Sequence, residues 1–375
     1  MADHITRDPV YKTVERDDFP AMIETDRYAQ RSDAFDEIIS LTVDHFWDPG
    51  DPAYVDFDGH FELEADTLMP REFFPEFNCE VAERLDEGQR IQLANELTRF
   101  SLSQILHGEQ GALSLSASLC HILWDPGAQE YAANQVREEA RHVNAFSRYI
   151  AVRWGAPLPV GQSLEDFMTG IVLAPEVYKK LVGMQMIIEG FAMGAFATMH
   201  SKTHDPLLRR VIQLVMTDEA FHHRFGRIWA GLTVPKLSEQ EHIRVEDWAE
   251  SNFQMLLGSL MSPEQKKDIY PRFGLDWEWV RDAVTESFTD AVRRKAMSRS
   301  TNAFRVLIKT LLHAGIITDR TRATYARWVD MAELVREGGG LVAEDVANDS
   351  LVELREINRS RKKIGASARS VFASG

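Results

Sequence analysis

Cysteine is nearly absent from this sequence of 375 residues, in which only Cys79 and Cys120 occur. A disulfide scaffold, a zinc site built from thiolates and an iron–sulfur cluster held by four cysteines are therefore not expected. Such sparing use of cysteine fits a reducing cytoplasm.

Positive charge is also scarce, because 42 Lys and Arg face 58 Asp and Glu, which gives a net charge of -16. This balance argues against a nucleic-acid partner and does not favour attraction to anionic membranes. The first residues, MADHITRDPVYKTVERDD, have neither the basic start nor the apolar run of a signal peptide. We therefore expect a cytoplasmic protein.

One apolar stretch, residues 181–199, has the length of a membrane span. Glu189 lies at its centre, where a bilayer would make a carboxylate expensive. No second span and no basic flank support a membrane topology. The stretch is therefore predicted to be a core helix of a large helical protein, which is hydrophobic all round, and no membrane span is expected.

Strict alternation of polar and apolar residues is rare, so the fold is predicted to be all-α. Residues 1–85 are rich in Asp, Pro and aromatic residues and are predicted to be an arm with short helices that packs on the rest. From residue 86, apolar residues recur every three or four positions. Four long helices are expected at residues 87–122, 128–154, 175–201 and 206–231.

These four helices are predicted to form a bundle over residues 86–232. A shorter helix at 163–171 is expected in the connection between the second and the third long helix. Residues 233–355 are predicted to add helices that complete one large domain, and residues 356–375 to form a basic flexible tail. The added helices are expected at residues 238–260, 275–295, 299–315 and 320–336.

Two helices carry a glutamate and a histidine one turn apart: Glu139 with His142, and Glu219 with His222. Residues three apart on a helix lie about 5 to 6 Å from each other at Cβ, close enough to share one metal ion. A hydrogen-bonded pair would have the same spacing. One such pair alone would therefore be weak support for a metal site.

The preceding helix in each half also carries a glutamate among apolar residues, Glu109 and Glu189. The separations repeat: 139 − 109 = 30 and 219 − 189 = 30, while 189 − 109, 219 − 139 and 222 − 142 are each 80. Two helical hairpins related by a pseudo-twofold axis would direct four carboxylates and two imidazoles at one centre. Such ligands suit iron or manganese, and four buried glutamates without a cation would repel one another.

This pattern resembles that of the carboxylate-bridged di-iron proteins of the ferritin-like superfamily, over about residues 87–231. The resemblance implies a ferritin-like four-helix bundle with additional N- and C-terminal helices, and two iron ions, or manganese with iron. It makes Glu138 and Asp218 outer acids that hold the ligand imidazoles. The implied ligands are Glu109, Glu139, His142, Glu189, Glu219 and His222.

The register has a rival. Glu138 lies four residues before His142, and His223 lies four after Glu219, so either could replace its neighbour.

The resemblance favours an O2-dependent oxygenase or oxidase, with a monooxygenase as the expected type, acting on a small organic or acyl substrate. A ferritin-type iron store or ferroxidase is an alternative, but its subunits are shorter. The radical tyrosine of ribonucleotide reductase small subunits is replaced by Phe146, the threonine of bacterial multicomponent monooxygenases by Met193, and the extra histidine of arylamine N-oxygenases by Val215. Each departure puts that specific activity in doubt.

Residues one or two turns from the ligands on the same stripe are candidates for a substrate pocket, although ordinary core packing is the favoured interpretation of each. Gln135 and Gln185 are the more informative, because each is polar in an apolar setting. The candidates are Leu113, Ser116, Gln135, Phe146, Gln185, Met193 and Phe196.

The sequence has no phosphate-binding glycine motif and no cysteine cluster. Electrons for a di-iron centre would thus come from a separate reductase or ferredoxin. A homodimer is implied by the resemblance alone. A metal-free helical interaction protein remains the alternative from another class.

Overall fold

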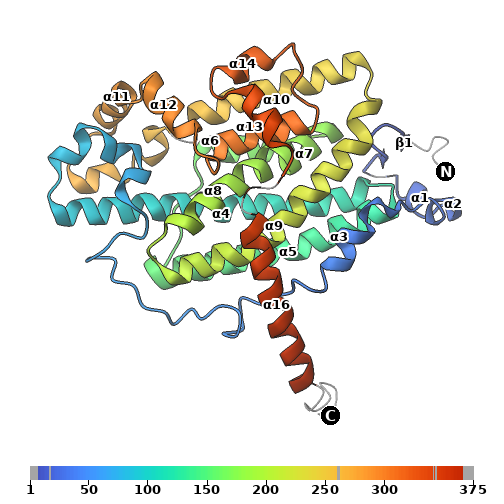
Figure 1. Cartoon of the computed structure of the whole chain (residues 1–375), viewed down its shortest axis with the longest axis horizontal. Coiled ribbons are helices and arrows are strands. Elements are labelled where there is room, and N and C mark those ends of the chain that lie inside the picture. The colour runs from blue at the N-terminus through green and yellow to red at the C-terminus, as the bar shows by residue number, and fades with distance from the viewer. Residues whose placement is uncertain (1–6, 17, 260–261, 341, 343, 366–375) are drawn as a thin grey trace.

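The computed structural model describes residues 7–16, 18–259, 262–340, 342 and 344–365, and these are mostly helical (Figure 1). The all-α prediction is confirmed, since the strands in this part of the chain are one antiparallel pair of two residues each, β1 (Arg7–Asp8) and β2 (Thr13–Val14).

The four predicted long helices are present, and local signals explain where they begin. Asp86 caps the first of them in a capping box with Gln89. Asp125 and Asp205 cap the second and fourth, each followed by a proline at the first helical position. The four are α4 (Glu87–Ile122), α5 (Pro126–Trp154), the run of α7 (Val177–Val182), a π-helical segment (Gly183–Ile188) and α8 (Glu189–Lys202), and α9 (Pro206–Thr233).

These helices pack in pairs. α4 lies along α5 as a long antiparallel hairpin, α8 packs against α9, and α9 also contacts α5 (Figure 1). The remaining helices cover this core: α6 (Gln162–Val172) lies on α4, α10 (Glu239–Ser259) on α7, and α13 (Ala303–His313) on α8.

The arm before residue 86 consists of short pieces, as predicted. They are α1 (Phe19–Met22), α2 (Thr25–Tyr28), α3 (Asp36–Leu41) and the 3₁₀ turns Asp33–Phe35, Arg71–Phe73, Pro75–Asn78 and Glu80–Arg84.

Two predicted helices after α10 are wrong in their extent. The segment 275–295 is divided into α11 (Trp277–Ser287) and α12 (Asp290–Met297), and the segment 320–336 into α14 (Arg322–Ala326) and α15 (Met331–Glu337). The breaks fall where Thr289 and Asp330 cap a new helix with their side chains. The 3₁₀ turns Val234–Lys236, Pro263–Lys266 and Tyr270–Phe273 complete this region.

The predicted tail boundary at residue 356 is also wrong, because it falls inside α16 (Glu344–Gly365). This helix packs on α9, buries Leu354 and projects beyond the body of the protein (Figure 1). Asn358 on it accepts a hydrogen bond from the Tyr54 hydroxyl and donates one to the Phe46 carbonyl, at 2.6 and 2.9 Å. The helix thus ties the arm to the bundle. The rest of the predicted tail, 366–375, lies outside the described residues.

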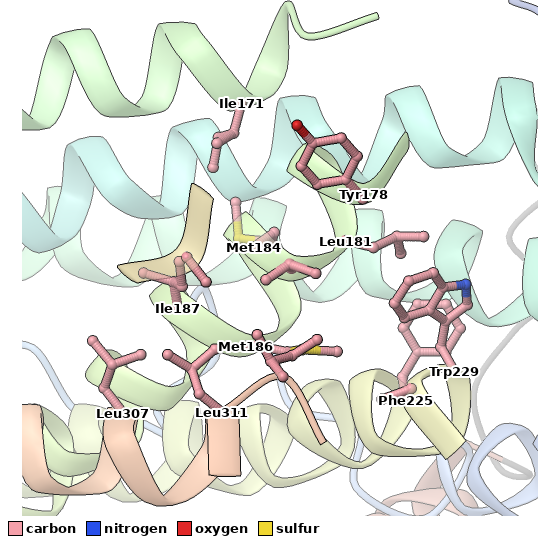
Figure 2. Packing of buried hydrophobic residues seen from close by; sticks show 14 of the residues in the cluster. Ile171, Tyr178, Leu181, Met184, Met186, Ile187, Phe225, Trp229, Leu307 and Leu311 are labelled. Carbon is pink, nitrogen blue, oxygen red and sulfur yellow. The ribbon is translucent and has the colours of Figure 1, made fainter. Parts of the chain in front are cut away.

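Two apolar clusters fill the bundle and leave a polar layer between them. On α5, Tyr131 belongs to the first cluster and Phe146 to the second, and the Glu139–His142 pair lies between the two. Figure 2 shows part of the first cluster, to which Met184 and Met186 of the π-helical segment belong together with Phe225 of α9. Burial of a large apolar side chain contributes roughly 1.5–3 kcal/mol, so these clusters hold the helices that flank the polar layer.

The apolar stretch at residues 181–199, which has the length of a membrane span, lies in the core of the protein. The run Val177–Lys202 is long and apolar enough to cross a membrane by length and composition, yet 72% of its most apolar window is buried inside the protein. Its neighbours α9, α10 and α13 supply that burial.

Candidate metal centre

The six residues predicted as ligands meet in the polar layer between the two clusters. α4 supplies one, α5 two, α8 one and α9 two. None of the six is more than 6% exposed, so bulk water is largely kept away. Their potential ligand atoms form two overlapping groups, each within 4.8 Å: Glu109, Glu139, His142 and Glu219 in the first, and Glu139, Glu189 and His222 in the second.

Two carboxylates span both histidines. Glu219 places Oε1 3.1 Å from His142 Nδ1 and Oε2 3.2 Å from His222 Nδ1. Glu139 places Oε2 3.4 Å from His142 Nδ1 and Oε1 3.2 Å from His222 Nδ1. The other two carboxylates take one side each: Glu109 lies 3.2 Å from His142 Nδ1, and Glu189 lies 3.9 Å from His222 Nδ1. Two cations could share the first two carboxylates and have one of the others each.

The imidazoles present Nδ1 to this layer and Nε2 to the outer acids. His142 Nε2 lies 2.9 Å from Asp218 Oδ2, and His222 Nε2 lies 2.9 Å from Glu138 Oε2. Each histidine is thus held by the acid of the other helix, a crossed pairing that links α5 to α9. An N–H donated from Nε2 leaves the Nδ1 lone pair facing inward, which is the tautomer a metal ligand needs.

Burial and the neighbouring charges together set the pKa values in this layer. It raises the pKa of Glu109 and Glu189 well above the usual glutamate range, and nearby Glu219 and Glu139 raise that of Glu189 further. Burial alone would lower the pKa of His142, but the facing carboxylates outweigh it and raise that pKa well above 6.5. Without a cation the layer holds protons on neighbouring groups, so metal binding is expected to release them.

The residues fit a pair of hard cations. Glu139 Oε2 is fully buried and has no hydrogen-bond donor among the described residues. Such an orphaned anionic oxygen is costly unless a cation neutralises it. Carboxylate oxygen and imidazole nitrogen in this ratio suit iron or manganese.

Three residues that contact the outer acids Glu138 and Asp218 were not identified as functional from the sequence. His45 Nε2 lies 2.7 Å from Glu138 Oε1, Trp47 donates its indole N–H to Asp218 Oδ2 at 2.8 Å, and Arg141 Nε donates to the same oxygen at 3.0 Å. His45, Glu138 and Asp218 could also group around an ion. Their oxygens are already engaged by imidazole, indole and guanidinium groups, so we interpret them as supports for the inner layer.

Only a weak signal points to these supports in the sequence. His45 and Trp47 belong to the segment HFWDPG of the arm, which shares no spacing with the paired motifs. Their role depends on α16 and the arm folding over α9.

In the structure, neither Glu138 nor His223 replaces its neighbour in the polar layer. His223 points away from the polar layer, with Nε2 3.1 Å from the Thr310 hydroxyl of α13. Burial lowers the pKa of His223 to about 4. Glu138 faces outward to His45 and His222.

The helix that carries Glu189 has a π-helical turn immediately before that residue, at Gly183–Ile188. Such turns are rare and widen the helix by one residue per turn. Gly226 of α9 packs directly on this turn, because a Cβ built on it would lie 2.7 Å from Gln185 Cβ and 2.8 Å from the Gln185 carbonyl oxygen. Only glycine allows so close an approach.

Gly226→Ala is expected to destabilise the metal-free protein by about 1–3 kcal/mol, because the backbone of Gln185 would have to move. Urea denaturation measures this change. Gly231→Ala on the same helix is the matched control, since nothing lies within 4 Å of its added methyl, and it should be neutral or stabilising by up to about 1 kcal/mol. Equal unfolding midpoints for the two variants would contradict the close packing.

The predicted pocket residues do not all lie together. Phe146 and Phe196 belong to one apolar cluster and stack with ring centroids 5.9 Å apart, and Met193 of α8 is also buried. Gln135 and Gln185 are fully buried beside the other cluster and hydrogen-bond to each other at 3.1 Å. Ser116 is buried on α4, and its hydroxyl has no partner among the described residues.

Comparison with models of known protein families gave no match, and no curated protein matched the chain either.

Proposed function

We propose that this chain is a ferritin-like di-iron oxygenase or oxidase that uses O2 to oxidise a small organic or acyl substrate. The observation that carries the proposal is that Glu139 and Glu219 each direct one oxygen toward His142 and the other toward His222. Two carboxylates that span two imidazoles match the ligand set of dinuclear sites in helical bundles.

Under this proposal, each half of the centre holds one iron ion. Glu109 and His142 would serve one half, Glu189 and His222 the other, and the two spanning carboxylates would serve both. When bound, the iron pair supplies the electrons that reduce O2 to an oxidant able to attack a C–H or N–H bond.

The protein's own residues set the conditions for that chemistry. Asp218 and Glu138 fix the ring orientation of the two histidines by accepting from Nε2. Arg141, whose Nη2 lies 2.8 Å from Asp218 Oδ1, offsets the negative charge behind the layer. The apolar clusters on both sides exclude water, which protects a reactive oxidant from being quenched by solvent.

The apolar side chains next to the polar layer support the proposal that the substrate is organic. Phe146 and Phe196 stack in one apolar cluster, and Met193 is buried one turn after Glu189, which favours a substrate whose reacting part is apolar. Electrons would come from a separate reductase or ferredoxin.

The test is an anaerobic titration of the metal-free chain with Fe(II), followed by O2, with the visible spectrum and the final iron content recorded. Saturation at two irons per chain with an oxygen-dependent absorbance change supports the proposal. Continued uptake far beyond two would move the function to iron storage, and binding of no iron would refute the metal centre.

A further inference from the structure

A pair of buried amides lies against one half of the candidate centre. Gln135 Nε2 donates to Glu139 Oε1 at 3.0 Å and to Glu189 Oε1 at 3.2 Å. Gln185 Nε2 in turn donates to Gln135 Oε1 at 3.1 Å. Both amides are no more than 1% exposed, so water does not compete for these hydrogen bonds.

The chemistry of the carboxylates determines how both amides are oriented. A carboxylate that binds a cation is ionised and only accepts hydrogen bonds, so with cations bound the NH2 group of Gln135 must face Glu139 and Glu189. Its carbonyl oxygen must then face Gln185, which donates to it. The π-helical turn places Gln185 there, and the contact with Gly226 of α9 holds that turn close.

Among the residues that the structure describes, no such amide donates to Glu109 in the other half of the centre. The two halves repeat with an offset of 80 residues, as in 219 − 139 = 80. The counterpart of Gln135 at 135 + 80 is therefore Val215, and that of Gln185 at 185 − 80 is Ile105. Val215 is fully buried in an apolar cluster, and Ile105 packs against the same cluster. The pseudo-twofold pattern of the ligands therefore does not extend to their surroundings.

The two carboxylate oxygens that accept from Gln135 are those that face His222. Glu139 Oε1 lies 3.2 Å and Glu189 Oε1 lies 3.9 Å from His222 Nδ1. Gln135 Nε2 thus holds Oε1 of Glu139 and Oε1 of Glu189 on the side where a cation bound to His222 would contact them. A carboxylate oxygen has two lone pairs, so it can accept a hydrogen bond from the amide and bind a cation at the same time.

We propose that Gln135, oriented by Gln185, is a positioning residue that makes the two cation positions unequal by holding Glu139 and Glu189 for the cation at His222. The inference rests on the metal centre of the proposed function. It assigns to these two amides a role toward the ligands that differs from the substrate-pocket role predicted from the sequence.

The test is a Mn²⁺ titration of the full, metal-free chain, followed by calorimetry and electron paramagnetic resonance. In Gln135→Met, which keeps the length of the side chain, one Mn²⁺ position is expected to retain its affinity and the other to weaken about 10–100-fold. At two Mn²⁺ per chain the spectrum should change from that of a coupled pair to the six-line signal of isolated Mn²⁺.

A second variant separates positioning from general damage. Gln185→Met should produce a smaller loss at the same position, and the double variant should be no worse than Gln135→Met, because Gln185 acts only through Gln135. Val215→Ala changes the residue that corresponds to Gln135 in the other half. A titration of this variant should show no loss of Mn²⁺ affinity at the position that Gln135→Met weakens.

Three results would overturn the inference: equal weakening of both positions in Gln135→Met, no weakening at either, or additive losses in the double variant. A wild-type chain that binds no Mn²⁺ and no Fe²⁺ would remove the proposed function as well. Two-site binding that is unchanged by Gln135→Met would remove the inference alone.

Discussion

Replacing Glu139 with alanine is expected to abolish tight binding at both cation positions. Glu139 offers Oε2 to the His142 side and Oε1 to the His222 side, so its loss removes a ligand from each. Residues that merely orient metal ligands typically change affinity by about 10–100-fold, so loss of a shared ligand should exceed about 100-fold.

The contrast with Glu109→Ala makes this prediction specific. Glu109 lies near His142 only, so that variant should lose one position and keep the other. Bound metal per chain, measured after equilibrium dialysis against Fe(II) or Mn²⁺, distinguishes the two results. Glu165→Ala, at an exposed residue of α6, serves as the control and should bind as the unchanged chain does. Retention of one tight site in Glu139→Ala would show that Glu139 serves a single position.

Glu139→Ala should also remove stabilisation by metal. A ligand that binds only the folded state adds about 2.7 kcal/mol at a concentration 100 times its dissociation constant. Thermal melting with and without Mn²⁺ should therefore show an increase for the unchanged chain and none for Glu139→Ala. A similar increase in both would mean that the cation binds elsewhere.

The second large effect is expected at a buried ion pair far from the centre. Glu76 in the arm is fully buried, contacts the Lys266 ammonium and accepts a hydrogen bond from the Tyr270 hydroxyl at 2.7 Å. Lys266 is itself only 8% exposed. Glu76→Gln leaves that ammonium buried without its counter-charge, which is expected to cost about 3–5 kcal/mol in free energy of unfolding.

A double variant tests the physical reason. Glu76→Leu combined with Lys266→Met replaces both charges by apolar groups, and such replacements are often neutral. Chemical denaturation should therefore show most of the loss in Glu76→Gln and little in the double variant. Glu176→Gln removes the partner of a partly exposed lysine, Lys179, and should cost less than about 1 kcal/mol. An equally small cost for Glu76→Gln would show that Lys266 finds solvent or another partner.

The same ion pair predicts a pH dependence. Burial alone would raise the pKa of Glu76, but the Lys266 ammonium and the Tyr270 hydroxyl outweigh it and bring that pKa below its usual 4.5. The folded state then binds this proton less readily than the unfolded state. The contribution of Glu76 to stability is thus present above pH 4.5 and is lost as the pH falls through the folded value. The stability difference between the unchanged chain and Glu76→Gln should shrink on acidification over that range.

By itself, the sequence determined the long helices and the candidate ligands. Both depend on local or periodic features: caps such as Asp86 and Asp125 begin helices, and the repeated offset of 80 residues identifies both Glu-x-x-His pairs and their partner glutamates. The extent of α16 was not predictable in this way, because its polar sequence gains its helix by packing Leu354 on α9 and binding the arm through Asn358.

Only the tertiary structure decided the surroundings of the centre. The crossed pairing of His142 with Asp218 and of His222 with Glu138 depends on how α5 and α9 face each other. His45 and Trp47 reach the outer acids across more than 90 residues of chain. The π-helical turn before Glu189 depends on Gly226 meeting Gln185. Periodicity reports which face of a helix is buried, whereas these features depend on which residues of distant segments come into contact, and that is determined only when the whole chain packs.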